Sequence, residues 1–154
     1  MEIGKIDKKK LLENTKVLID KNIPLVANLA NLSRLFMDSF DNTLWCGFYL
    51  SDDDNKMLYL GPYQGPLACT TIPFGKGVCG TSAQNKVTCL VPDVHKFPGH
   101  IACSSLSNSE IVVPILKNNK VVGVIDLDSE SFNNYSEEDQ KLLEEVALLI
   151  GELF

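Results

Sequence analysis

Residues 110–128 have the sequence EIVVPILKNNKVVGVIDLD, in which two runs rich in β-branched residues flank the polar tetrapeptide KNNK. This pattern is typical of a β-hairpin. Side chains alternate along a strand, so Asp126 and Asp128 should project from one face of the second run. Val122 and Val124 are expected on that face as well. The segment therefore predicts a hairpin that carries two carboxylates at the end of its second strand.

The register of this hairpin decides whether Glu110 joins the two aspartates. A regular two-residue turn at residues 118–119 would place Glu110 opposite Leu127, facing away from them. A three-residue loop or a bulge would instead place Glu110 opposite Asp128. We predict such an irregularity, or that Glu110 precedes the paired region, if the three acids form one site.

Earlier in the chain, runs rich in aromatic and β-branched residues predict further strands. These runs are TLWCGFYL (43–50), MLYLGPY (57–63), CTTIPF (69–74) and VTCLV (87–91). GKGVCGTSAQNK, residues 75–86, is typical of a glycine loop that leads into a short helix. Residues 92–109 contain Pro, Gly, Ser and Asn without periodicity, which indicates a lid or site-forming loop.

Amphipathic helices are predicted at both ends of the chain. Apolar residues recur at helical spacing over residues 11–19 and 25–36, and Ser136 with Asp139 forms a capping pattern before a final helix. Helices, then five or six strands, then a helix predict an α+β fold. Its central antiparallel sheet should carry the N- and C-terminal helices on one face. The 154 residues show no linker, which predicts a single domain over residues 1–154.

Composition excludes several classes of protein. The formal net charge of −6 disfavours nucleic acid, because phosphate contacts depend on clustered Lys and Arg. No apolar stretch is long enough to span a membrane, and MEIGKIDKKK does not resemble a secretory signal. Five cysteines without an export signal indicate a reducing, cytoplasmic compartment.

Three of the cysteines are candidates for thiol redox chemistry. Cys69, Cys79 and Cys103 are spaced too widely for a CxxC pair, so only the tertiary fold can bring them together. The alternative for each is a small buried apolar residue, which free cysteines commonly are. We favour that alternative for Cys46 and Cys89, which lie within strand patterns.

The acidic residues permit an independent interpretation. Carboxylates at the end of an apolar strand are costly unless they are solvated or bound to a ligand. Packing carboxylates together raises the pKa of at least one of them, which yields an acid able to donate a proton near neutral pH. The alternative is a solvated strand end, which is more plausible for Asp128 alone than for Glu110, Asp126 and Asp128 together.

Six motifs distributed over nearly the whole chain occur together. They are WCGFYL (45–50), GPLAC (65–69), GKGVCG (75–80), PDVHKFPGHIAC (92–103), SEIVVP (109–114) and GVIDLDS (123–129). This set resembles the free methionine-(R)-sulfoxide reductases, which are built on a GAF domain. A generic GAF domain shares the fold but lacks this set of cysteines and carboxylates.

The resemblance implies an oxidoreductase that reduces free methionine-(R)-sulfoxide and serves in oxidative stress, without a cofactor. It implies that Cys103 attacks the sulfoxide sulfur and becomes a sulfenic acid. Cys69 is the matching resolving thiol and Cys79 a third redox cysteine. The resulting disulfide would be reopened by a thioredoxin-type reductant. A bridge between Cys69 and Cys103 requires their Cα atoms to lie within about 7 Å.

The resemblance also assigns the substrate-binding residues. Glu110, Asp126 and Asp128 match the acids that bind the substrate and take part in catalysis. Trp45 and Tyr49, four apart and so on one strand face, match the wall around the methyl and thioether groups. Ordinary core packing is the alternative for both aromatic residues. A homodimer is common in the family and is a candidate assembly here.

The sequence is open to two competing interpretations. A metal site could use His95, His100 and Cys103 with Cys69 or Cys79, but zinc sites usually show close pairs such as CxxC, so no metal is expected. For the two histidines we favour structural roles over a role in lowering the pKa of Cys103. The second interpretation is a non-catalytic GAF domain that senses a small molecule or a redox change. The acidic pocket argues against a cyclic nucleotide as its ligand.

Overall fold

The computed structural model describes residues 5–154 and contains six strands and four α-helices within them. The strands are β1 (Thr43–Asp52), β2 (Met57–Gln64), β3 (Thr71–Pro73), β4 (Cys89–Val91), β5 (Ser109–Lys117) and β6 (Lys120–Ser129). The helices are α1 (Leu11–Leu18), α2 (Leu25–Ser39), α3 (Gly77–Asn85) and α4 (Glu137–Gly151), with short 3-10 turns η1 (Lys8–Lys10) and η2 (Val94–Lys96).

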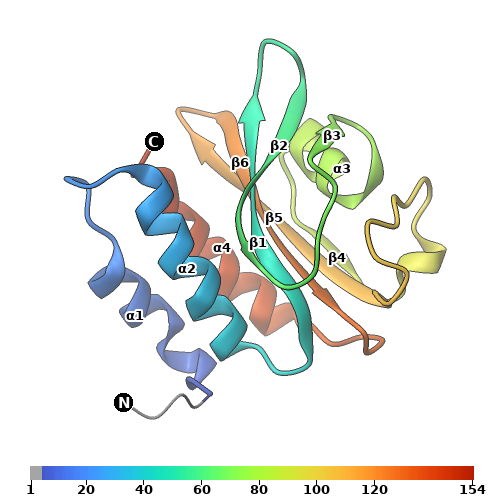
Figure 1. The fold of residues 1–154 in the computed structure, drawn as a ribbon, viewed down its shortest axis with the longest axis horizontal. Helices are drawn as coiled ribbons and strands as arrows, with labels where there is room; N and C mark the ends of the chain where they lie inside the picture. The colour runs from blue at the N-terminus through green and yellow to red at the C-terminus, as the bar shows by residue number, and fades with distance from the viewer. Residues whose placement is uncertain (1–4) are drawn as a thin grey trace.

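The strands form one antiparallel sheet in the order β3-β2-β1-β6-β5-β4. The N- and C-terminal helices α1, α2 and α4 lie together on one side of it, while α3 and the loop that follows β4 lie on the other (Figure 1). This arrangement confirms the predicted α+β fold. It also gives the sheet two buried faces, one covered by α1, α2 and α4 and the other by α3 and the loop after β4.

Period-two alternation divides the strand side chains between two apolar clusters. Phe48, Ile125 and Leu127 point toward α2 and α4 and are completely buried there. Tyr49 and Val124 point the other way, toward α3. Burying an apolar side chain on either face stabilises the fold by about 1.5 to 3 kcal/mol relative to leaving it exposed. The β1 and β6 strands at the centre of the sheet are therefore packed on both faces.

The β5–β6 hairpin has the predicted irregularity. Its turn consists of Asn118 and Asn119, both with positive φ (50° and 62°), as a type I′ turn requires. Lys117 pairs with Lys120 across this turn, yet Glu110 pairs with Asp128, because the register shifts by one residue along the hairpin. The prediction that an irregularity brings Glu110 onto the aspartate face is confirmed.

The same bulge corrects one expectation about β6. The shift falls where Val122 is the unpaired residue, since Leu116 pairs with Val121 and Ile115 with Gly123. Val122 consequently packs against the cluster under the helices, whereas Val124 lies on the opposite face. The prediction that Val122 shares the face of Asp126 and Asp128 was wrong, because the extra residue inverts the alternation beyond it.

The end of the chain is organised as predicted. Ser136 accepts a hydrogen bond from the Asp139 backbone N–H (3.1 Å), and the Asp139 side chain accepts one from the Ser136 N–H (3.0 Å). This capping box begins α4, which then packs along β5. Within residues 5–154, no helix is both long enough and apolar enough to cross a bilayer.

Candidate active site

A cavity of about 590 Å³, including the space at its mouth, lies on the sheet face that α3 covers. Seven of the eight residues predicted from the sequence as a site line this cavity. They are Trp45, Tyr49, Cys79, Cys103, Glu110, Asp126 and Asp128. The eighth, Cys69, is bonded to one of them. A cavity of this size, apolar with a few convergent polar groups, is suited to a small molecule.

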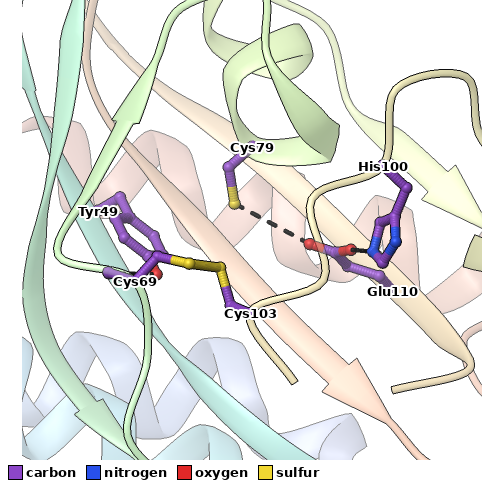
Figure 2. Close-up of a disulfide and its surroundings, with 6 residues drawn as sticks. All are labelled: Tyr49, Cys69, Cys79, His100, Cys103 and Glu110. Carbon is purple, nitrogen blue, oxygen red and sulfur yellow. Dashed lines mark hydrogen bonds and ion pairs between the residues drawn. A yellow bond between two sulfur atoms is a disulfide. The ribbon is translucent and has the colours of Figure 1, made fainter. Parts of the chain in front are cut away.

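Cys69 and Cys103 form a disulfide bond beside the cavity (Figure 2). Their Cα atoms are 5.6 Å apart, which meets the requirement stated from the sequence. Cys69 lies between β2 and β3, and Cys103 lies in the loop between η2 and β5. The Tyr49 hydroxyl donates a hydrogen bond to the Cys69 carbonyl oxygen (3.0 Å) and thereby holds the first of these segments against β1.

The Cys79 thiol lies in the first turn of α3 and lines the same cavity. It is buried, and its Sγ is 4.0 Å from Glu110 Oε1 (Figure 2). Burial, reinforced by the negative charge of Asp126, raises the pKa of this thiol well above its usual value. Cys79 is therefore a protonated thiol at neutral pH, with none of the thiolate character of a ready nucleophile.

The three carboxyl groups gather on adjacent strands. Glu110 and Asp126 are 6% and 5% exposed, and Asp128 accepts a hydrogen bond from the Ser107 hydroxyl (3.0 Å). Desolvation raises the pKa of all three, and the charge of a neighbouring carboxylate raises each further. A raised pKa lets a carboxyl group keep its proton at a higher pH than usual, which suits the group to donate a proton.

Asp126 is the least satisfied member of this group. Its Oδ1 is buried and has no hydrogen-bond partner among residues 5–154. Within the same residues, the only basic side chain with a nitrogen within 4 Å of any of the three carboxyl groups is that of His100, which is charged only when protonated. Because a buried carboxylate without a partner is costly, the site is built to receive a cation or a proton from a ligand.

Aromatic rings form one wall of the cavity. A bulge at the start of β1 pairs Trp45 with Asp128 and Tyr49 with Val124. The Trp45 and Tyr49 rings stack with centroids 5.9 Å apart, and Tyr63 stacks on the other side of Trp45 at 5.2 Å. The strand positions thus confirm that Trp45 and Tyr49 share a face, and they place an apolar surface directly beside the acids.

The two histidines differ in position. The Nε2 atom of His100 is 3.7 Å from Glu110 Oε2, and burial lowers the pKa of the ring. His95 is largely exposed and pairs with Asp93 (Nδ1 to Oδ1, 2.9 Å) at the start of η2. His100 therefore contacts the acidic group, and His95 helps to shape the loop.

The remaining cysteines lie outside the cavity lining. Cys46 is completely buried beneath α2, where its Sγ donates to the Ser33 carbonyl oxygen (3.2 Å) and burial raises its pKa to about 12. Cys46 is thus the small buried residue that was predicted. Cys89, on the edge strand β4, is a free and partly buried thiol.

Metal-ligating atoms also converge in the cavity. Donor atoms of Cys79, Glu110 and Asp126 lie within 4.8 Å of one another, which occurs for no other group of three such residues in the described part of the chain. This set differs from the one considered from the sequence, because Cys103 is bonded to Cys69 and His95 is exposed.

The similarity of the chain to known proteins agrees with this site. A sequence model of the GAF domain matches residues 28–154. GAF domain-containing protein A of Dictyostelium discoideum is 46% identical over 97% of this chain and 96% of that protein. The free methionine-R-sulfoxide reductase of Saccharomyces cerevisiae is 44% identical over 92% of this chain and 82% of the yeast protein.

A solved structure is similar at the same level. The X-ray structure of free methionine-R-sulfoxide reductase from Neisseria meningitidis in complex with its substrate is 43% identical to this chain and superposes with a TM-score of 0.89. The match covers 96% of this chain and 87% of the other. The chain belongs to the free methionine-R-sulfoxide reductase family of GAF domain proteins.

Membership of the reductase family confirms the resemblance drawn from the six motifs. Sequence reasoning nevertheless missed Ser107, which lines the cavity, and Tyr63, which stacks on Trp45. Ser107 lies in a loop of many serines, and nothing in its spacing distinguishes it from Ser104 or Ser105. Tyr63 lies in a predicted strand, but its partner across the sheet could not be inferred without the register of β1 and β2.

Proposed function

We propose that this protein reduces free L-methionine-(R)-S-oxide to L-methionine. The observation that carries the proposal is a disulfide between Cys69 and Cys103 beside a cavity that also holds three buried carboxyl groups. The relatives support it, since the yeast protein is a free methionine-R-sulfoxide reductase and the Neisseria enzyme has a structure with its substrate.

The chemistry of the cavity fits this substrate. Methionine sulfoxide as the free amino acid has an ammonium group, a polar sulfoxide oxygen and an apolar methyl group. The carboxylates of Asp126 and Asp128 would bind the ammonium group, which compensates their burial. The rings of Trp45 and Tyr49 would contact the methyl and thioether groups. A methionine within a peptide has no ammonium group to offer.

The reaction requires one attack and one condensation. The Cys103 thiolate attacks the sulfoxide sulfur, and a carboxyl group protonates the oxygen. The oxygen then passes to the Cys103 sulfur, while the substrate S–O bond and the new bond between the two sulfur atoms both break and methionine leaves. Cys103 then carries the oxygen as a sulfenic acid. The Cys69 thiol condenses with it, which releases water and forms the disulfide present in the structure. The substrate has gained two electrons, supplied by the two thiols.

A second cycle requires two electrons from outside. The bridged cysteines are both partly exposed, which allows an external thiolate to attack one of the sulfur atoms. A thioredoxin-type dithiol would reopen the bond by exchange, so no bound cofactor is needed. Because the cycle depends on an external dithiol, we place the protein in a reducing cytoplasmic compartment. We also propose that all 154 residues form one GAF domain.

A substrate panel tests the proposed function. The reduced protein is assayed with thioredoxin, its reductase and three substrates: free methionine-(R)-sulfoxide, the free S epimer and a peptide that contains methionine sulfoxide. We expect turnover of the first alone. Activity on the peptide would contradict the role of the ammonium group. Binding without turnover of any substrate would instead indicate a ligand-sensing GAF domain.

The role of Cys69 is tested by Cys69→Ser. The variant should complete one turnover and then stall, because Cys103 keeps its sulfenic acid when no neighbouring thiol condenses with it. We expect the steady-state rate with thioredoxin to fall about 10-fold or more. The buried, protonated Cys79 should replace Cys69 only slowly.

Intact mass after a sulfenic-acid trap measures this intermediate. Cys89→Ser is the matched control, because it removes a partly buried thiol that forms no bond and should keep the wild-type rate and mass. A Cys69→Ser variant with the full thioredoxin-coupled rate and no trapped product would show that Cys69 is not the resolving thiol.

A further inference from the structure

The Cys79 side of the cavity holds a set of donor atoms for which the proposed reaction uses only the carboxyl groups. Cys79 Sγ, a Glu110 oxygen and an Asp126 oxygen lie within 4.8 Å of one another, and all three residues are buried. Around a tetrahedral zinc ion, such donors are about 3.3 to 3.6 Å apart, given the usual bond lengths of 2.0 to 2.3 Å. Small side-chain rotations would bring the three atoms to these separations.

The three donors suit zinc, and a nitrogen donor nearby is not one of them. His100 Nε2 is 3.7 Å from Glu110 Oε2, while Cys79 Sγ is 4.0 Å from the other oxygen of the same carboxylate, so the two atoms lie on opposite sides of Glu110 (Figure 2). Cysteine sulfur and carboxylate oxygen are ligand types that zinc accepts, and a site with three protein ligands leaves a fourth position for water.

A second observation points to a ligand at this site. Asp126 Oδ1 is buried without a hydrogen-bond partner, and Asp126 lines the cavity next to Cys79. Among residues 5–154, no lysine or arginine pairs with Glu110 or Asp126. A divalent cation would supply the missing partner and compensate both negative charges.

We propose that the protein binds one Zn²⁺ ion through Cys79, Glu110 and Asp126, and that this ion excludes the substrate from the cavity. The three residues come from α3, β5 and β6. A bound ion would occupy Asp126, which the proposed function assigns to the ammonium group of the substrate. The metal site does not rest on the proposed function; only its competition with the sulfoxide does.

Cobalt binding to the disulfide-bonded protein tests the site. In this form Cys69 and Cys103 are bonded to each other, so Cys79 is the cavity thiol that remains free to bind metal. Titration with Co²⁺ should give the intense visible bands of a tetrahedral ion and a sulfur-to-cobalt charge-transfer band, at one ion per chain. Zn²⁺ should abolish both signals by displacing the cobalt.

Two conservative variants distinguish Cys79 from Cys89, the free thiol that is only partly buried. Cys79→Ser should lose the charge-transfer band and weaken cobalt binding about 10-fold or more, because even outer residues of metal sites contribute this much. Cys89→Ser should bind cobalt as the wild type does. Glu110→Gln should weaken binding while it retains the charge-transfer band. An unchanged band in Cys79→Ser, or only the weak spectrum of an octahedral ion in the wild type, would overturn the proposal.

Competition is measured separately. Free methionine sulfoxide should displace Co²⁺ from the wild-type protein, and Zn²⁺ should raise the KM for the sulfoxide in the thioredoxin-coupled assay. Cobalt binding in a protein that fails to turn over any sulfoxide would leave the metal site intact and refute the proposed function. Turnover by a protein that binds no metal would refute the metal site and leave the proposed function intact.

Discussion

Cys103→Ser is expected to lower kcat/KM for free methionine-(R)-sulfoxide by about 10³-fold or more, a loss typical of removing a nucleophile. A serine hydroxyl is not ionised at neutral pH and cannot take up the sulfoxide oxygen as a sulfenic acid. The side chain is only partly buried and lies in a loop, so the substitution should leave the fold intact. Steady-state kinetics with thioredoxin measure the loss.

Two comparisons make the Cys103 result specific. The variant lacks the disulfide, so its circular dichroism and Tm are compared with those of the reduced wild type, and both should agree. Cys89→Ser is the same chemical change at a thiol that forms no disulfide, and it should keep full activity. Wild-type turnover by Cys103→Ser would refute its assignment as the attacking residue.

Asp126→Asn is expected to produce opposite changes in activity and stability. The amide cannot exchange a proton with the sulfoxide oxygen or attract the ammonium group, so kcat/KM should fall about 10² to 10⁴-fold. It also removes a carboxyl group whose Oδ1 is buried without a partner. The free energy of unfolding at pH 8 should therefore rise, by about 1 to 3 kcal/mol.

The pH dependence of stability follows from the direction of the pKa shift. Burial raises the pKa of Asp126 in the folded protein, with the charge of Glu110 adding to the effect. As the pH rises above the ordinary aspartate pKa, the unfolded chain releases this proton while the folded protein keeps it, so the wild type loses stability. The loss is complete once the pH exceeds the raised pKa, and Asp126→Asn should lose less stability over this window.

Urea unfolding at a series of pH values measures this difference. Asp54→Asn is the matched control, because Asp54 lies exposed in the turn after β1 and should change neither activity nor the pH dependence. Retained activity in Asp126→Asn would contradict the role of the carboxyl group. A variant less stable than the wild type at pH 8 would contradict the inference that burial of this group destabilises the fold.

Much of the fold could be predicted because it depends on patterns between residues that are close in the sequence. The alternation in β1, β5 and β6, the capping box before α4 and the helical spacing of α1 and α2 each depend on neighbours a few residues apart. The bulge in the β5–β6 hairpin could also be predicted, because Glu110 and Asp128 share a face only if the register shifts. The structure has that bulge, although its place at Val122 was not predicted.

Candidate site residues could be predicted from the sequence because six motifs resemble one enzyme family, whereas their contacts could not. Cys69 and Cys103 are 34 residues apart, and only the closure of the loop after η2 decides that their sulfur atoms meet. The same closure places His100 against Glu110 and Ser107 against Asp128. Strand and helix positions follow from short-range repeats in the chain. Contacts made by an irregular loop depend on the whole packed surface beneath it, which no local pattern encodes.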